Sequence, residues 1–275
     1  MSRPLTVAVV THNSLADLRR FFRGQLETAA ELGATAVVVD NASTDGSVPF
    51  VRAVAGEAAV VVANPRNRGY AAAVNRAFAV EAQSDVLVLN PDVELAAAAP
   101  VEAMVRLMRG NPRIGTVGPC LVNEDGTIQS SARRFPSPLA MGRDARTIRR
   151  LRAARRAARA YVSPPAEGAP SRVDWVTGAA MLIRREAFEE VGGWDEGFYM
   201  YLEDTDFCRR LVRAGWATWY LPAARLRHLH ARQSDRAAGG LLRSRARRVH
   251  LRSMARFFAR YPELISGRHL ASSSG

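Results

Sequence analysis

Four short apolar runs in the first 95 residues constrain the fold more than any other feature of the chain. We expect strands at residues 5–10, 36–39, 60–63 and 85–89, with apolar residues at helical spacing between them. Strands that alternate with helices at a spacing of roughly 20 to 30 residues form βαβ units and therefore a parallel sheet. The sequence thus predicts an α/β fold built on a mostly parallel sheet flanked by helices.

Polar residues follow each of these strands at the point where it ends. They are Asn13, Asp40, Asn67 and Asp92, the last of which comes after Asn90 and a proline. Any one of them is explained equally well as a turn residue or a helix cap. Parallel strands end at one edge of the sheet, however, and ligands of open α/β sheets bind outside that edge. Together the four residues predict a binding edge, at which the carboxylate of Asp92 suits a divalent metal.

The first helix is expected to begin with a capping box. Ser14 stands three residues before Asp17, and apolar residues then recur at helical spacing. In such a box the side chain of the first residue accepts a hydrogen bond from the third helical N–H.

The chain changes character after residue 96, where we expect a smaller mixed half. A helix at 101–109, a hairpin around Asp125 and Gly126, and an apolar strand through 175–183 precede a helix that ends at Gly215. Glu203, Asp204 and Asp206 stand at the start of that helix. They complement its dipole, which is a sufficient structural reason for them, and the dipole would also keep Asp204 ionised as a general base requires.

Two further patterns each allow two interpretations. Residues 226–230 alternate like a strand, so that His228 and His230 share one face; they are either structural or a ligand pair. The arginine-rich segments 133–159 and 241–261 are either solvated helices or surfaces for an anionic lipid or an acceptor's pyrophosphate.

Composition indicates a soluble globular protein with an anionic partner. The chain has 275 residues, 48% of them hydrophobic, and a formal net charge of +13 that comes entirely from arginine. That charge suits nucleic acid, an anionic membrane or a phosphorylated substrate. Cys120 and Cys208 are too few for a disulfide framework and are expected in the core.

The chain begins without a signal-peptide pattern and has no apolar run of the roughly 18 residues that a spanning helix needs. We therefore expect a cytoplasmic protein, with any membrane contact peripheral on the inner face of the plasma membrane.

Read in order, the motifs resemble those of glycosyltransferase family 2, the inverting GT-A enzymes, in its rhamnosyltransferase-like branch. The resemblance covers roughly residues 5–235. The motifs that carry it are Val10–Ser14, Val39–Ser47, Asn67–Ala71 with Asn75, Asn90–Asp92, Thr177–Ala179, and Trp194–Glu196 followed by Glu203–Asp206. One departure is Asn90, which replaces the first Asp of the family's Asp-x-Asp motif and predicts a weaker metal affinity.

The resemblance implies a GT-A (Rossmann-like) fold and a role for each matching residue. Residues 1–235 would form the transferase domain, with a nucleotide-sugar half to about 95 and an acceptor half from 96, before an arginine-rich helical extension at 236–275. Mg²⁺ or Mn²⁺ would be held by Asp92 and His228, and Asp204 would be the catalytic base. The donor would be bound by Thr11, Asn13, Asp40, Asn67, Arg68, Gly69, Asn75 and Asn90.

The implied activity is transfer of a sugar, with rhamnose from dTDP-rhamnose as the first choice, to a hydroxyl of a lipid-linked or polysaccharide acceptor in cell-envelope glycan synthesis. A transferase of the same family that uses another UDP-sugar is the alternative. From other classes, a basic nucleic-acid-binding protein lacks any recognised module. A sugar-nucleotide pyrophosphorylase lacks its glycine-rich loop and lysine, because residues 8–20 contain no glycine and the chain no lysine.

Overall fold

The computed structural model describes residues 3–141, 161, 168–229 and 245–265. The first part of the chain contains β1 (Leu5–Thr11), α1 (Leu15–Glu31), β2 (Thr35–Asp40), α2 (Ser47–Ala55), β3 (Ala59–Ala63), α3 (Tyr70–Val80) and β4 (Asp85–Leu89). The following part contains β5 (Val93–Glu94), α4 (Ala99–Gly110), β6 (Ile114–Val122), β7 (Ala132–Arg133), α5 (Pro138–Met141), β8 (Ser171–Val173), β9 (Trp175–Val176), β10 (Ala180–Ile183), α7 (Arg185–Glu190), α8 (Glu203–Arg213) and β11 (Ala217–His228). The last described elements are α9 (Arg245–Arg260) and a 3₁₀ turn, η3 (Pro262–Leu264).

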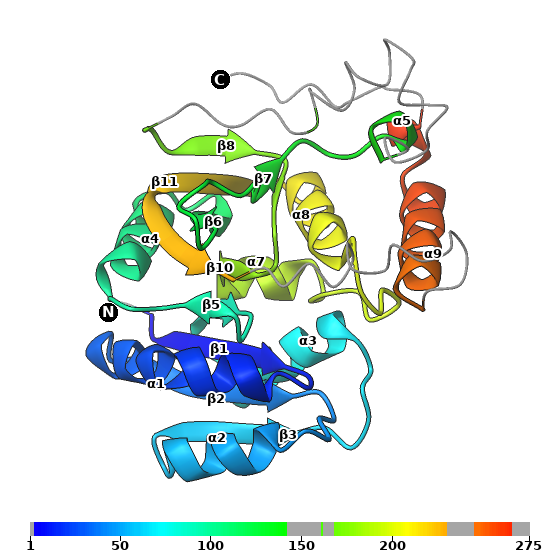
Figure 1. Ribbon diagram of the computed structural model, residues 1–275. Coiled ribbons are helices and arrows are strands. Elements are labelled where there is room, and N and C mark those ends of the chain that lie inside the picture. Colours follow the sequence, from blue (N-terminus) through cyan, green and yellow to red (C-terminus); the bar gives the residue numbers. More distant parts are fainter. Residues whose placement is uncertain (1–2, 142–160, 162–167, 230–244, 266–275) are drawn as a thin grey trace.

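The described strands form a nine-stranded sheet in the order β3-β2-β1-β4-β10-β6-β11-β5, with β8 beside β11 (Figure 1). β1 to β4 pair in parallel, as the sequence predicted. The second half is mixed, because β10 lies antiparallel between β4 and β6 while β6 and β11 are parallel. β7 and β9 form a separate two-stranded sheet.

Helices cover both faces of the sheet, so that β1, β2 and β4 are buried on both sides. On one face the apolar side chains of α1, α2 and α4 pack on strand residues such as Val7 and Val9 of β1. On the other face Ala8 and Val10 belong to a second cluster, to which α3, α7, α8 and α9 also contribute apolar side chains. Cys120 and Cys208 are buried in this second cluster as free thiols, which confirms their expected place in the core.

Two local expectations were wrong. The predicted capping box of α1 does not form; the Ser14 hydroxyl donates to the His12 carbonyl, and the N–H of Leu15 donates to Asp45 Oδ2 at 2.9 Å from the loop after β2. The single strand expected through 175–183 is two strands, β9 and β10, separated by a break at residues 177–179. In both places a contact distant in sequence replaces a local pattern.

The expected arginine-rich segment 143–159 and His230 lie outside the described residues. The C-terminal helix is described from Arg245 as α9 and lies beside α8 (Figure 1). Among the helices of the described residues, none is long and apolar enough to cross a bilayer.

Candidate active site at the carboxyl edge of the sheet

The carboxyl ends of β1 to β4 lie in a row, because these strands are neighbours and parallel. Thr11 is directly paired with Asp40, and Asp40 with Ala63. The expected convergence of the four strand exits is therefore present, and the loops that follow the strands form the site.

The β1 and β2 loops are held together by hydrogen bonds around Asn13, which has a left-handed φ of 50°. Its N–H donates to Ser43 Oγ at 2.7 Å, and its Oδ1 accepts from the Thr44 N–H at 2.8 Å. Asp40 accepts the Ser43 N–H at 2.8 Å with one carboxylate oxygen. Its other oxygen and the Thr11 hydroxyl are buried, with no hydrogen-bond partner among the described residues. Buried polar atoms of this kind require a partner, which a bound ligand or water supplies.

The β3 loop and the start of α3 pack against the segment before α8. Gly69 has a φ of +96°, and a Cβ there would lie 2.4 Å from the Tyr199 carbonyl oxygen, so that only glycine fits. The Asn41 amide donates to Asn67 Oδ1 and to the Gly69 carbonyl, each at 2.9 Å. Asn41 thus fixes the loop in which the predicted donor residues lie.

Three of the predicted donor residues make contacts within the protein. Asn67 Oδ1 also accepts the Gly69 N–H at 2.9 Å, and Arg68 forms an ion pair with Glu196 at 2.8 Å. Asn75 exchanges hydrogen bonds with the backbone of Trp194, at 2.8 and 2.9 Å. These side chains hold the Trp194–Glu196 segment against α3, which shapes this wall of the site.

Asp92 and His228 lie together where β5 and β11 pair. Asp92 Oδ1 is 3.3 Å from His228 Nε2, and the Leu229 N–H donates to the Asp92 carbonyl at 3.0 Å. Asn90 lies at the exit of β4, where its N–H donates to the Ala179 carbonyl. Asp17 is also close, since burial and then the charge of Asp92 raise its pKa.

Gln129 determines which nitrogen of His228 carries a proton. Its Nε2 donates to Asn123 Oδ1 and to the His228 carbonyl, each at 2.8 Å, so its Oε1 faces His228 Nδ1 at 2.8 Å as an acceptor. In neutral imidazole Nδ1 then holds the proton and Nε2 presents a lone pair to Asp92. Two electron-pair donors at this separation could occupy neighbouring positions around one cation.

Two carboxylates and phosphate oxygens are a common ligand set for Mg²⁺, whereas Mn²⁺ also accepts imidazole. Asp92 and His228 fit such an ion when a donor diphosphate supplies further oxygens. In the described part of the chain, no group of three or more His, Cys, Asp or Glu side chains is arranged to hold a metal by itself.

Asp204 lies in the first turn of α8, a helix that begins directly after Tyr201 and Leu202, which have left-handed φ values of 69° and 66°. Its Oδ2 accepts the Gly178 N–H at 3.0 Å, from the break between β9 and β10. Its Oδ1 accepts the N–H and the hydroxyl of Thr205, at 2.7 and 3.2 Å. Burial nevertheless raises the pKa of Asp204, so the helix dipole does not hold this carboxyl at ordinary acidity.

Tyr70, for which the sequence predicted no role, is close to both Asp204 and Asp92. Its hydroxyl donates to the Gly178 carbonyl at 2.7 Å, next to the N–H that binds Asp204. Burial, followed by the negative charges of Glu203, Asp204 and Asp92, raises the pKa of Tyr70 well above its usual value. Its position directly after Gly69 in the Asn67–Ala71 motif was the available signal. Gln129 had none, because its partner His228 is 99 residues away.

Residues 3–250 of the chain match the protein family described as "Glycosyltransferase like family 2". The chain belongs to glycosyltransferase family 2. This membership makes it an enzyme, and it decides against the nucleic-acid-binding class that the net charge had left open.

Among curated relatives of this family 2 enzyme is the N-acetylglucosaminyl-diphospho-decaprenol L-rhamnosyltransferase of Mycobacterium tuberculosis, 33% identical over 254 residues, or 86% of this chain and 79% of that protein. Rhamnosyltransferase WbbL of Escherichia coli is 40% identical over 97 residues, which cover 35% of this chain and 34% of WbbL. These relatives support the rhamnosyltransferase-like branch.

Among solved structures, a mannosyltransferase from Pyrobaculum calidifontis in complex with GDP-Man and Mn²⁺ superposes with a TM-score of 0.61. It is 21% identical, and the match covers 94% of this chain and 65% of that one. At this identity the likeness shows the fold, which is GT-A.

Proposed function

We propose that this enzyme transfers rhamnose from dTDP-rhamnose to a hydroxyl of a lipid-linked acceptor, with inversion at the anomeric carbon, in cell-envelope glycan synthesis. The observation that carries the proposal is the presence of a half-buried carboxylate, Asp204, and a separate Asp92–His228 pair, with Tyr70 close to both. The similarity to a rhamnosyltransferase over 86% of this chain supports the sugar and the acceptor class.

A single displacement needs one base and one site for the leaving group. Asp204 accepts the proton of the acceptor hydroxyl while that oxygen bonds to the anomeric carbon, and the bond from this carbon to the donor's diphosphate oxygen breaks. Asp204 is suited to this because burial makes it a stronger base, while the Gly178 N–H fixes its orientation. Mg²⁺ or Mn²⁺ held by Asp92 and His228 would offset the charge on the departing nucleoside diphosphate.

The donor end of the site is proposed to be the β1–β3 loops. Thr11 and Asp40 would bind the base and ribose through the oxygens that lack protein partners, with Asn13 fixing their loops. Asn67, Arg68, Gly69, Asn75 and Asn90 would shape the nucleotide-sugar pocket. The division into a donor half to about residue 95 and an acceptor half from 96 to 235 belongs to this proposal, as does an anionic membrane surface as a further partner of the basic chain.

The test uses the purified full chain with Mn²⁺, a short-chain N-acetylglucosaminyl prenyl diphosphate as acceptor, and a panel of dTDP- and UDP-sugars. We expect dTDP release from dTDP-rhamnose and a rhamnosylated lipid by mass spectrometry. Asp204→Asn should lower the rate by about 100- to 10,000-fold, the range for loss of a general base. Release at the wild-type rate would remove Asp204 from this role, and turnover of only a UDP-sugar would replace rhamnose.

A further inference from the structure

The break between β9 and β10 contacts both carboxylate regions of the site. Its last residue, Ala179, accepts the Asn90 N–H with its carbonyl at 2.8 Å. One residue earlier, the Gly178 N–H donates to Asp204 Oδ2 at 3.0 Å. The position of the Gly178 backbone therefore helps to determine where the carboxylate of Asp204 lies.

Gly178 is packed closely among three side chains. A Cβ at this position would lie 3.1 Å from the Trp194 ring, 3.3 Å from the Tyr70 ring and 3.6 Å from Asp204 Cβ. The two shorter distances are tighter than ordinary van der Waals contact, so a larger residue would displace its neighbours. Glycine also has more backbone conformations open to it than any other residue, so contacts from outside must fix it.

Tyr70, at the start of α3, supplies such a contact. Its hydroxyl donates to the Gly178 carbonyl at 2.7 Å. Its ring packs edge-to-face against Trp194, with 5.9 Å between the ring centroids. The N–H and the carbonyl of Gly178 are thus both bonded to side chains, the first to Asp204 and the second to Tyr70.

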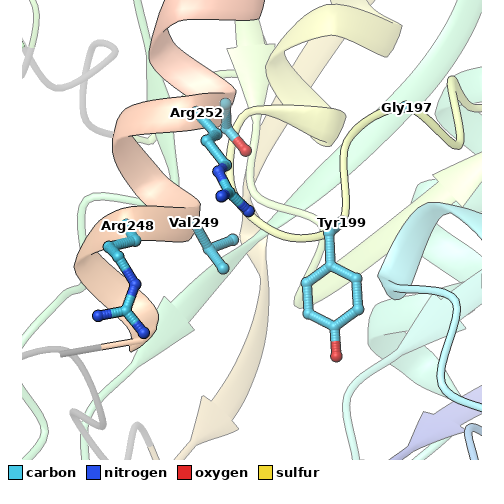
Figure 2. A pocket seen from close by; sticks show the side chains of 6 residues that line it. Gly197, Tyr199, Arg248, Val249 and Arg252 are labelled. Atoms are coloured by element: carbon cyan, nitrogen blue, oxygen red, sulfur yellow. The ribbon is translucent and has the colours of Figure 1, made fainter.

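The backbone of Tyr70 is held by contacts that do not involve its hydroxyl. Its N–H donates to the Tyr199 carbonyl at 3.0 Å, and the Gly69 carbonyl just before it accepts the Asn41 amide at 2.9 Å. Figure 2 shows Tyr199 on the segment that leads into α8, where it lines a cavity opposite Val249 of α9. Removal of the hydroxyl should therefore release Gly178 and leave the start of α3 in place.

The two oxygens of Asp204 differ in what they have left to accept. Oδ1 accepts both the N–H and the hydroxyl of Thr205. In the described part of the chain Oδ2 accepts one hydrogen bond, from Gly178, and so keeps a lone pair. Oδ2 is therefore the oxygen that suits proton removal, and Gly178 is the residue that orients it.

We propose that Tyr70 is a positioning residue for the base. Its hydroxyl holds Gly178, and Gly178 holds Oδ2 of Asp204 in the direction from which the acceptor hydroxyl approaches. The role of Asp204 as base belongs to the proposed function, on which this inference rests. Misplacement of a reacting group by about 1 Å can lower a rate by about 100-fold, so a contact that fixes the base has a measurable effect.

Steady-state kinetics of Tyr70→Phe tests the role, because this change removes the hydroxyl and keeps the ring against Trp194. We expect kcat to fall about tenfold, while the dissociation constant for dTDP-rhamnose with Mn²⁺ stays within about twofold, since the change affects orientation of the base alone. Tyr261→Phe is the matched control, because its hydroxyl also donates to a carboxylate of α8, that of Asp206 at 2.8 Å. It should retain kcat. An unchanged kcat in Tyr70→Phe, or an equal fall in the control, would overturn the proposal.

A double-mutant cycle separates an effect through Asp204 from a general loss of structure. In Asp204→Asn the base is already absent, so Tyr70→Phe should lower the remaining single-turnover rate by less than about twofold, as expected of residues that act as a unit. A tenfold fall in both backgrounds would show that Tyr70 acts in another way.

The nuclear magnetic resonance signal of the Gly178 amide tests the same contact without turnover. Thr177 and Gly178 form the only Thr-Gly pair in the sequence, so ¹³C-threonine with ¹⁵N-glycine selects this amide. Its signal should move in Asp204→Asn, which replaces a charged acceptor, and in Tyr70→Phe, but not in Tyr261→Phe.

The amide signal also distinguishes this inference from the proposed function. An unmoved signal in Tyr70→Phe would remove the positioning role, even where Asp204→Asn abolishes transfer. A signal that moves as expected, in a protein whose Asp204→Asn variant transfers sugar at the wild-type rate, would overturn the proposed base and leave the chain of contacts from Tyr70 to Asp204.

Discussion

Two adjacent carboxyl groups at the start of α8 have different surroundings. Asp204 accepts hydrogen bonds from Gly178 and Thr205, which favour its ionised form. Glu203 is also buried, and its Oε2 has no hydrogen-bond partner among the described residues. Burial and the neighbouring charge of Asp204 raise the pKa of Glu203 well above its usual value. Of the two groups, Asp204 is therefore the one whose hydrogen bonds favour the ionised form that a base needs.

The difference between Glu203 and Asp204 predicts how the rate of transfer depends on pH and on the variants Glu203→Gln and Asp204→Asn. A base must be ionised, so the rate should fall as the pH falls through the pKa of Asp204, which burial places above its ordinary value of 3.8. Glu203→Gln resembles the protonated glutamate and should retain the rate within about threefold. Asp204→Asn should lose far more than that, because it removes the group that accepts the proton. The measurement is kcat/KM against pH for both variants. A loss in Glu203→Gln as large as that in Asp204→Asn would reverse the assignment.

Gln129 is expected to act as a positioning residue through His228. Gln129→Leu removes the acceptor that holds the proton on Nδ1, so Nε2 no longer presents its lone pair consistently to Asp92. We expect the affinity for Mn²⁺ with a nucleotide sugar to fall by about 10- to 100-fold, as for other partners of ligating histidines. Titration of free Mn²⁺ by electron paramagnetic resonance measures this without turnover. Gln129→Glu keeps an acceptor and should rescue much of the affinity; no loss in Gln129→Leu would contradict the role.

At the scale of elements, α9 is held on the domain by a buried acidic residue of α8. Asp206 is fully buried and accepts hydrogen bonds from Arg210, Arg260 and the Tyr261 hydroxyl, at 2.8, 3.2 and 2.8 Å. Asp206 belongs to the acidic group that sequence reasoning placed at the start of this helix. Its side chain connects two helices, which a pattern local to α8 does not reveal.

Asp206→Asn should destabilise the fold by about 3 kcal/mol, because it leaves the nearly buried Arg210 without its ionic partner. Asp195→Asn is the graded comparison. Among the described residues, Asp195 pairs with the half-exposed Arg256 and Arg260, so its loss should cost about 1 kcal/mol or less. Urea unfolding monitored by tryptophan fluorescence gives both values. An equal loss of unfolding free energy in the two variants would show that the buried position of Asp206 does not increase its contribution to stability.

The elements divide into those that the sequence predicts and those that depend on distant partners. β1 to β4 were predictable, because their apolar runs and helical intervals repeat within short distances along the chain. The insertion of β10 between β4 and β6 was not, since its pairing joins residues 89 and 180. The hydrogen bond from the Leu15 N–H at the start of α1 to Asp45 was not predictable for the same reason, since the two residues are 30 apart. Predicted site residues such as Thr11, Asp40 and Asp92 follow strand ends, whereas Tyr70 and Gln129 required the folded chain.

At the scale of the whole molecule, the site draws on two regions far apart in the sequence. The proposed donor loops follow the parallel strands β1 to β4, while Asp204 belongs to α8. The net charge of +13 attracts phosphorylated partners to both regions. Donor binding and proton removal should therefore respond to different substitutions.

Asp92→Asn and Asp204→Asn are expected to separate these two tasks. At about 100 times the dissociation constant, dTDP-rhamnose with Mn²⁺ should raise the melting temperature of the wild type by roughly 5–10 °C. Asp204→Asn should keep this shift and lose transfer, because its side chain lies on the acceptor side. Asp92→Asn should lose the Mn²⁺-dependent part of the shift, because it removes a metal ligand. Differential scanning fluorimetry with Mn²⁺ or EDTA measures the shift in both variants. A shift that is lost in Asp204→Asn would contradict the assignment of separate tasks to Asp92 and Asp204. A shift that does not depend on metal in the wild type would contradict it as well.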